Sequence, residues 1–256
     1  MNAVFAIARR EFDAYLASPI GWICLTAFSL LNGFFFVLIM WSYVEYTAQA
    51  MFNPGQADSI NVNDQIVAPL FSNMSVIALF MVPALTMRLI ADDRRSRAID
   101  LLLTSPITSW QITTGKYLGA LAFAAALVVT TLHFPAFLFW LGEPDTNVVY
   151  AQYASFFLLL ATFMATGLFA SSLTDNQLVA LVLGFGINLF LWIVGWSSSV
   201  ADEGTIKTLI EAFAMVPHVE RLGKGLLHVK DIVYFVTFIG LCLFATAQRV
   251  EALRWR

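Results

Sequence analysis

Long hydrophobic runs without a single charged residue alternate with short polar segments along this chain. A helix needs about 20 predominantly apolar residues to cross a bilayer, and six runs reach that length or come close. They are Ile20–Val44, Ile66–Met87, Leu118–Leu141, Val148–Leu173, Leu178–Val200 and Ile232–Gln248. None alternates with the period of two that marks a membrane barrel strand. The pattern therefore predicts an all-α integral membrane protein with six transmembrane helices.

The first 18 residues show a different pattern, that of an amphipathic helix. On a helical wheel, Arg9, Arg10 and Asp13 lie opposite an apolar face made of Val4, Phe5, Ala8, Phe12, Tyr15 and Leu16. A helix of this kind suits the plane of the membrane interface. A cleavable secretory signal is not expected, because such a signal has an early apolar stretch followed by small residues. We predict an N-terminal interfacial helix over residues 1–18.

We predict one transmembrane domain over residues 1–256, with three sizeable connections. Residues 88–117 form a charged loop, and 45–65 and 201–231 form two polar segments on the other side of the membrane. The second of these contains GTIKTLIEAFAMV, which is too short and too charged to span. It is either an external helix or a re-entrant pair whose backbone protein or water must cover.

Several helix starts carry recognisable capping signals. Ser18-Pro19 looks like a cap followed by proline at the first helical position. Residues 108–111, TSWQ, and 174–177, TDNQ, match the capping box and should open the third and fifth spans. Residues 174–177 are also the whole connection between the fourth and fifth spans. Because this connection is so short, the two spans should form an antiparallel hairpin.

Composition and charge place these helices in lipid and orient them. The chain is 59% hydrophobic and only 12% charged, and all of its charged residues fall outside the six runs, whereas a soluble domain carries about 25% charged residues. With the N-terminus in the cytoplasm, only Lys207, Arg221, Lys224 and Lys230 lie outside. Ten cations then lie inside, namely Arg9, Arg10, Arg88, Arg94, Arg95, Arg97, Lys116, Arg249, Arg254 and Arg256. The bias predicts that both termini are cytoplasmic.

The residues argue against several kinds of function. No G-x-x-x-x-G-K-[ST] motif is present, so the chain should not bind ATP phosphates itself. Charged residues inside the spans would mark an ion pathway, and their absence argues against an ion-coupled carrier. Cys24 and Cys242 lie in apolar runs as small hydrophobes rather than a disulfide or metal pair, and His133 has no partner ligand nearby. A net charge of −3 with scattered cations argues against nucleic acid as a partner.

The loop between the second and third spans is the most distinctive segment. Arg94–Thr104 reads as a short amphipathic helix, with a leucine triplet on one side and charges on the other. Ser105-Pro106 should end it, since the residue before proline resists the α region, and a helix should restart at Thr108 and run through Lys116. A loop that needed only charge would require neither the leucines nor the break. We predict a rigid, bent segment through which a binding partner can move the second and third spans.

This loop, ADDRRSRAIDLLLTSPITSWQITTGKY, resembles the first cytoplasmic loop of ABC-2-type transporter permeases, whose members read approximately G-T-I-E-L-L-L-T-S-P followed by W-Q-I and G-K. RREFDAYLASPIGW near the N-terminus and PHVERLGKGLLHVKDIVYF before the last span are similar to the gliding-motility-associated subfamily. The three pieces are spread over the whole length of the chain.

The resemblance implies a type V exporter fold in a bacterial inner membrane, with an interfacial helix and a cytoplasmic coupling helix. Two permeases, identical or different, would pair with two separate ATPase subunits that bind ATP and Mg²⁺, while this chain needs no cofactor and holds no metal. Some relatives work beside a large extracytoplasmic auxiliary protein, which leaves room for such a partner here, along with membrane lipids. The coupling residues would be Asp92, Asp93, Arg94, Arg95, Arg97, Asp100, Leu101, Leu102 and Leu103.

The chain departs from the family pattern at Arg97-Ala98, which stand where relatives have Gly-Thr. Losing a glycine removes a flexible point, so we expect a more continuous helix here. The leading function is a non-catalytic permease subunit of an ATP-driven exporter, which either moves a cargo or transmits force. The alternatives are an ion-coupled secondary transporter and a membrane scaffold that transports nothing.

Overall fold

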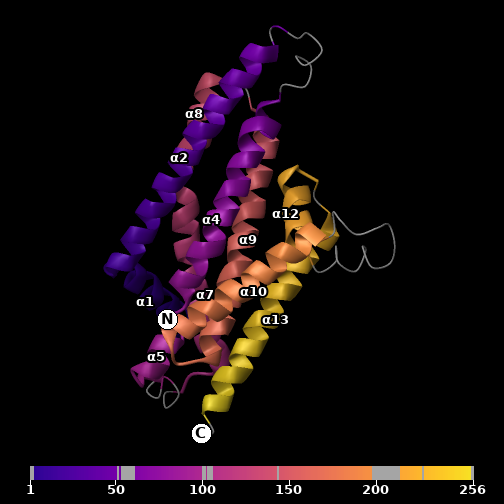
Figure 1. Cartoon of the computed structure of the whole chain (residues 1–256). Coiled ribbons are helices and arrows are strands. Elements are labelled where there is room, and N and C mark those ends of the chain that lie inside the picture. The colour runs from indigo at the N-terminus through magenta and orange to yellow at the C-terminus, as the bar shows by residue number, and fades with distance from the viewer. Residues whose placement is uncertain are drawn as a thin grey trace.

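The computed structural model describes residues 3–50, 52, 61–99, 102, 106–142, 144–197, 214–226 and 228–254. Over these ranges the chain is built from helices and contains no strand (Figure 1). The elements are α1 (Ala3–Ala17), α2 (Pro19–Ala50), the π-helix η1 (Asn63–Val67), α4 (Ala68–Thr86), α5 (Ala91–Arg95), α7 (Ser109–Val129), α8 (His133–Leu141), α9 (Thr146–Leu173), α10 (Gln177–Ser197), α12 (Met215–Gly223) and α13 (Val229–Leu253).

Six helical segments of the described chain are long and apolar enough to cross a membrane, which agrees with the six hydrophobic runs. α9 lies at the centre, because it packs against α4, α7, α10, α12 and α13 and is buried along most of its length. The outer helices instead expose large apolar side chains such as Phe34 and Trp41 of α2 and Phe190 of α10. A protein whose outside is this apolar suits a lipid solvent.

α2 is longer than the run that predicted it. The sequence suggested a span from Ile20 to Val44 and a polar segment from Glu45 onward, but the helix continues to Ala50. Its 32 residues make a rod about 48 Å long at 1.5 Å per residue, well above the roughly 30 Å of a hydrocarbon core. The end of α2 therefore extends beyond the core or the helix tilts.

The third hydrophobic run, Leu118–Leu141, is not one straight helix, because α7 ends at Val129 and α8 starts at His133. Pro135 has no N–H to donate to the carbonyl of Thr131. That carbonyl instead accepts a hydrogen bond from the hydroxyl of Tyr153 at 3.0 Å. Threonine hydroxyls that bond back to their own helix favour such bends, and the Thr131 hydroxyl does so.

The capping predictions have different outcomes. Thr108 does open α7 through a complete capping box with Gln111. The box predicted at Thr174 is wrong, because α10 begins only at Gln177 and its cap is Asn176, whose Oδ1 accepts from the backbone N–H of Leu178 at 2.9 Å. The side chain of Gln177 is turned away from the cap and donates to Asp92 Oδ1 at 2.7 Å. Contact with another helix thus replaces the local bond.

The two chain ends lie at the same end of the molecule as α5 (Figure 1). The end of α13 is tied there, since the guanidinium of Arg254 donates to the carbonyl of Ile107 at 2.7 Å and Ser109 hydrogen bonds to Glu251. At the other end, α12 packs against α9 and α10. Most of GTIKTLIEAFAMV lies outside the described residues, and the last span starts earlier than predicted, at Val229.

Candidate functional site

The helix predicted over Arg94–Thr104 is broken near its start. α5 ends at Arg95, and Arg97 has a φ of 58°, in the left-handed region that favours glycine. The hydroxyl of Ser96 donates to the carbonyl of Asp92 at 2.8 Å and helps to close α5 at this point. The expectation of a more continuous helix is therefore wrong. The turn carries the chain back toward the core, where Ile99 is buried.

The start of α5 is held by a serine of α9 rather than by its own acidic residues. Ser171 Oγ accepts from the backbone N–H groups of Ile90 and Ala91, both at 3.0 Å, and its hydroxyl donates to the carbonyl of Met87 at 2.9 Å. Neither Asp92 nor Asp93 caps α5: Asp93 forms ion pairs with Lys116 and Arg10, and Asp92 accepts from the amide of Gln177. One hydroxyl fixes the connection between α4 and α5 against the central helix.

The predicted coupling residues other than Asp92 and Asp93 differ in how far they are buried. Arg94 is half-buried and donates to the carbonyl of Ser172 at 3.1 Å, whereas Arg95 and Arg97 are exposed. Leu102 is half-buried and packs against the core, so this part of the leucine stripe faces the protein. The remaining members, Asp100, Leu101 and Leu103, lie outside the described residues.

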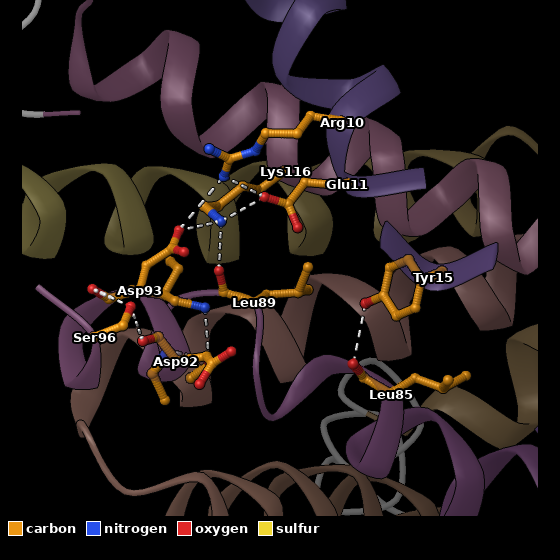
Figure 2. A network of polar contacts seen from close by, with 12 residues as sticks. Arg10, Glu11, Tyr15, Leu85, Leu89, Asp92, Asp93, Ser96 and Lys116 are labelled. Carbon is orange, nitrogen blue, oxygen red and sulfur yellow. Dashed lines mark hydrogen bonds and ion pairs between the residues drawn. The ribbon is translucent and has the colours of Figure 1, made fainter. Parts of the chain in front are cut away.

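Asp93 belongs to a cluster of charges that joins three helices (Figure 2). At its centre lies Lys116 of α7, whose side chain is 1% exposed. Its Nζ contacts Glu11 Oε1 of α1 at 2.7 Å, Asp93 Oδ2 of α5 at 2.6 Å and the carbonyl oxygen of Leu89 at 2.6 Å. The ammonium group donates hydrogen bonds to Glu11 and to the Leu89 carbonyl, and it forms an ion pair with Asp93.

Arg10 completes this Lys116 cluster from its exposed side. Its guanidinium lies 2.8 Å from Glu11 Oε1 and 3.8 Å from Asp93 Oδ2. Two cations therefore face two carboxylates, and the cluster is neutral as a whole. Buried charges are tolerated when they are paired and hydrogen-bonded in this way. Removing any one member would leave a net charge in a poorly solvated place.

Two glycines of α7 bring α1 close enough to form the cluster. A Cβ on Gly115 would lie 2.8 Å from Ile7 Cβ, and one on Gly119 would lie 2.6 Å from Glu11 Cβ. Small residues four apart allow two helices to approach closely. Because α1 packs through Ile7 and Glu11, Phe5 is 60% exposed, so the apolar face drawn from the helical wheel is rotated from the face that is buried.

α1 is also tied to the end of α4. The hydroxyl of Tyr15 donates to the carbonyl of Leu85 at 3.0 Å (Figure 2), and the guanidinium of Arg88 lies 5.1 Å from the centre of its ring. Arg88 also donates to the hydroxyl of Ser18 at 3.0 Å. The N-terminal helix is therefore locked to α4, α5 and α7 at one end of the molecule.

The electrostatics of the cluster favour its charged form. Burial by itself would raise the pKa of the Glu11 carboxyl, but the charges of Lys116 and Arg10 and their hydrogen bonds outweigh burial and lower this pKa below its ordinary value. The shift reports a favourable interaction of ionised Glu11 with the folded protein.

Sequence reasoning missed Glu11, Arg10 and Lys116 as parts of the site. The signals were present: Gly115 and Gly119 bracket Lys116 at a helix-packing spacing, and Glu11 stands one turn after Ile7. What connects them is a contact between residues 105 positions apart, which no local pattern reports.

The site is a set of ion pairs between helices. Among the described residues, no cluster of three or more His, Cys, Asp or Glu side chains could hold a metal ion. What the arrangement can do is mechanical, since α1, α5 and α7 are joined by ion pairs, and α5 is further joined to α9 and α10. A displacement of α5 must move these helices together or break buried ion pairs.

Comparison with protein families supplies the context for this arrangement. The model of the ABC-2 family transporter proteins matches residues 5–246, nearly the whole chain. The chain belongs to the ABC-2 family of transporter proteins. No curated protein sequence matches it closely enough to be reported as a relative. As an ABC-2 protein it is a multi-pass membrane component of an ABC transporter, and membership implies association with an ABC ATPase.

Proposed function

We propose that this chain is a non-catalytic permease subunit that couples ATP hydrolysis by a separate ATPase to transport or to force transmission across a bacterial inner membrane. The observation that carries the proposal is the Lys116 cluster. A buried ammonium group holds the interfacial helix α1, the loop helix α5 and the span α7 to one another through contacts of 2.6 to 2.7 Å.

In this proposal the ATPase contacts the exposed side of α5 and its turn. Arg95 and Arg97 are exposed there, and the cavity-lining residues Asp175 and Asn176 lie beside Arg95. The half-buried Leu102 instead anchors the loop to the permease. Two ATPase subunits would bind ATP and Mg²⁺, and two permease subunits, identical or different, would each supply one such loop.

The orientation follows from the same assignment. The ATPases are cytoplasmic, so the end that carries α5 and both termini would face the cytoplasm, in agreement with the distribution of Lys and Arg. We also assign the chain to the gliding-motility-associated subgroup, supported by the resemblance of residues 9–22 and 217–235, and an extracytoplasmic auxiliary protein is then a further candidate partner.

The test is recovery of an ATPase with the tagged chain from native membranes, detected by mass spectrometry. The wild-type chain should retain a P-loop ATPase, and the double change Arg95→Glu with Arg97→Glu should reduce its recovery about tenfold, which corresponds to about 1.4 kcal/mol. Lys230→Glu, an exposed cation in α13 at the opposite end, is the matched control and should leave recovery unchanged. Absence of any P-loop ATPase, or equal recovery with all variants, would contradict the proposal.

A further inference from the structure

A cavity of about 350 Å³ opens at the end of the molecule opposite the Lys116 cluster. It lies between η1, the first turns of α4, the first part of α9, the end of α10, and α12. Its apolar wall includes the buried rings of Phe71 and Phe156, with Trp192 and Val219 beside them. Sites for small molecules have volumes of this order, with mostly apolar walls and a few polar groups.

Three polar side chains that line this cavity, called the outer cavity from here on, are buried. Ser75, Gln152 and Ser155 line it and are 4%, 8% and 2% exposed. The two serine hydroxyls donate to carbonyls of their own helices and keep lone pairs free to accept. The amide of Gln152 makes no hydrogen bond to any described residue. The amide atoms are not among the enclosed side-chain atoms that lack a partner, so they are accessible from the cavity, where a ligand can bond to them.

α12 lies directly beside this amide. A Cβ on Gly223 would lie 2.7 Å from Gln152 Oε1, so a side chain there would displace the amide. α12 is itself anchored to α13, because the guanidinium of Arg221 lies 2.8 Å from the fully buried Asp231 and His218 hydrogen bonds to the same carboxylate. α12 is therefore held against α9 beside the amide, independently of any ligand.

Three charged side chains surround the mouth of the cavity. Asp64, Glu220 and Lys224 are exposed, and none forms an ion pair or side-chain hydrogen bond with another described residue. Two carboxylates and one ammonium group stand free beside an apolar hollow. A ligand that matches this pattern carries a cation and an anion on one head and has an apolar body.

We infer that this cavity binds a phospholipid whose head group carries a primary amine next to its phosphate, such as phosphatidylethanolamine. The ammonium group of the lipid pairs with Asp64 and Glu220, and its phosphate pairs with Lys224. The Gln152 amide donates its N–H groups to ester or phosphate oxygens, while the start of an acyl chain lies against Phe71, Phe156 and Trp192. The lipid comes from the leaflet at this end of the molecule.

The chemistry distinguishes this lipid from its neighbours in a membrane. Phosphatidylglycerol lacks a cation for the two carboxylates, which would repel it. Phosphatidylcholine has a cation but no N–H to donate, so it cannot form the charge-assisted hydrogen bonds that a primary ammonium forms with carboxylates. The inference does not depend on an ATPase partner, because binding is a property of this chain alone.

The test uses quenching of Trp192 fluorescence by lipids brominated on the acyl chain, with the purified chain in detergent micelles. The signal is the quenching measured for the wild-type chain minus the quenching measured for Trp192→Phe. This subtraction removes the contribution of the other tryptophans. Half-maximal quenching by phosphatidylethanolamine should require a concentration at least about fivefold lower than for phosphatidylcholine or phosphatidylglycerol. A single exposed ion pair contributes a factor of about two to five.

Variants of the cavity locate the binding. Lys224→Gln and Glu220→Gln should each weaken phosphatidylethanolamine binding about two- to fivefold, and Gln152→Leu should weaken it further. The exposed Lys230→Gln, outside the cavity, is the control. Thermal unfolding of each variant verifies the fold, and the two rim variants remain informative if Gln152→Leu unfolds.

Equal quenching by the three lipids, or equal binding by all variants, would mean annular lipid only and would overturn the inference. Protection of Trp192 from quenching by soluble phosphoethanolamine is a further test. If this compound protects Trp192 at the same concentration as the lipid, the ligand is a free phosphorylated amine and the lipid assignment is wrong; if it protects only at much higher concentration, the acyl chain contributes as inferred.

Discussion

Arg97 shows how a single backbone angle shapes the coupling loop. Its φ of 58° places a residue with a Cβ in a region that costs roughly 1–2 kcal/mol, and Arg97 is exposed, so no burial of its own side chain offsets that cost. The reason lies in its neighbours: α5 is closed by Ser96, and Ile99 is buried two residues later. The chain must turn between them.

Glycine at this position should therefore stabilise the protein. Arg97→Gly is expected to raise the free energy of unfolding by about 0.5–1 kcal/mol, after the higher entropy of glycine in the unfolded chain is subtracted. Arg97→Ala keeps a Cβ and should change it by less than about 0.5 kcal/mol. Denaturant titration in detergent measures both, and identical values for the two variants would contradict a left-handed Arg97.

Glu11 gives a second prediction at this scale, on pH. Its pKa is lowered in the folded protein, so its stabilising contribution is complete above the unfolded-state pKa of about 4.3 and is lost as pH falls through the lower folded value. The stability advantage of the wild-type chain over Glu11→Gln should be constant from about pH 8 to pH 5.5 and shrink below about pH 4.3.

Unfolding midpoints measured across this pH range test the sign. Asp13→Asn removes a carboxylate of the same helix that is 63% exposed and is the control for the loss of one negative charge. An advantage of wild type that grew toward acidic pH would contradict the ion pair between Glu11 and Lys116.

At the scale of elements, the packing of α1 against α7 depends on glycine. The close approach at Gly115 and Gly119 leaves no room for a side chain. It also brings the carboxylate of Glu11 within reach of a lysine that is otherwise surrounded by protein. Close helix packing therefore brings the two partners of the ion pair together.

Gly119→Leu should displace α1 while leaving the spans folded. Overpacking costs about 1–3 kcal/mol, and α1 can move off α7 more easily than two spans can separate. In a background of Cys24→Ser and Cys242→Ser, an Ile7→Cys probe should react slowly with a thiol reagent and at least about tenfold faster after Gly119→Leu.

Gly186→Leu is the matched control, because a Cβ there meets nothing within 4 Å. It should leave the reactivity of the probe unchanged. Equal acceleration by both leucines would point to general destabilisation of the bundle instead of release of α1.

At the scale of the whole molecule, Lys116 connects the loop to the bundle. Removing one partner of a buried ion pair typically costs 3–5 kcal/mol, whereas replacing the whole cluster by neutral groups can cost little. The cluster is therefore not required for stability as such. The cluster instead suits a role in holding α5 in one position relative to α1 and α7.

Lys116→Met alone should lower the free energy of unfolding by about 3–5 kcal/mol, and adding Glu11→Gln and Asp93→Asn should restore most of that loss. Under the proposed function, the triple variant still binds its ATPase but no longer couples hydrolysis to transport. Denaturant titration and transport-coupled ATPase assays measure the two effects. Normal coupling in a stable triple variant would contradict the mechanical role of the cluster.

The sequence predicted the helical class, the six apolar runs and the cap at Thr108, because each depends only on residues that are contiguous in the chain. It failed where two distant segments compete with a local signal. Gln177 does not cap α10 as predicted but donates to Asp92. Phe5 faces outward because α1 packs against Gly115 and Gly119 through Ile7 and Glu11.

By itself, the sequence determined that this chain is a bundle of apolar helices in lipid, because hydropathy acts on each run separately and charge-free runs have no other stable solvent. Tertiary structure alone decided the turn at Arg97, the burial of Lys116 and the unpartnered Gln152 amide beside the outer cavity. Those features depend on close approach between helices far apart in the chain, and distance in space, not order in sequence, sets the energy of an ion pair or a hydrogen bond.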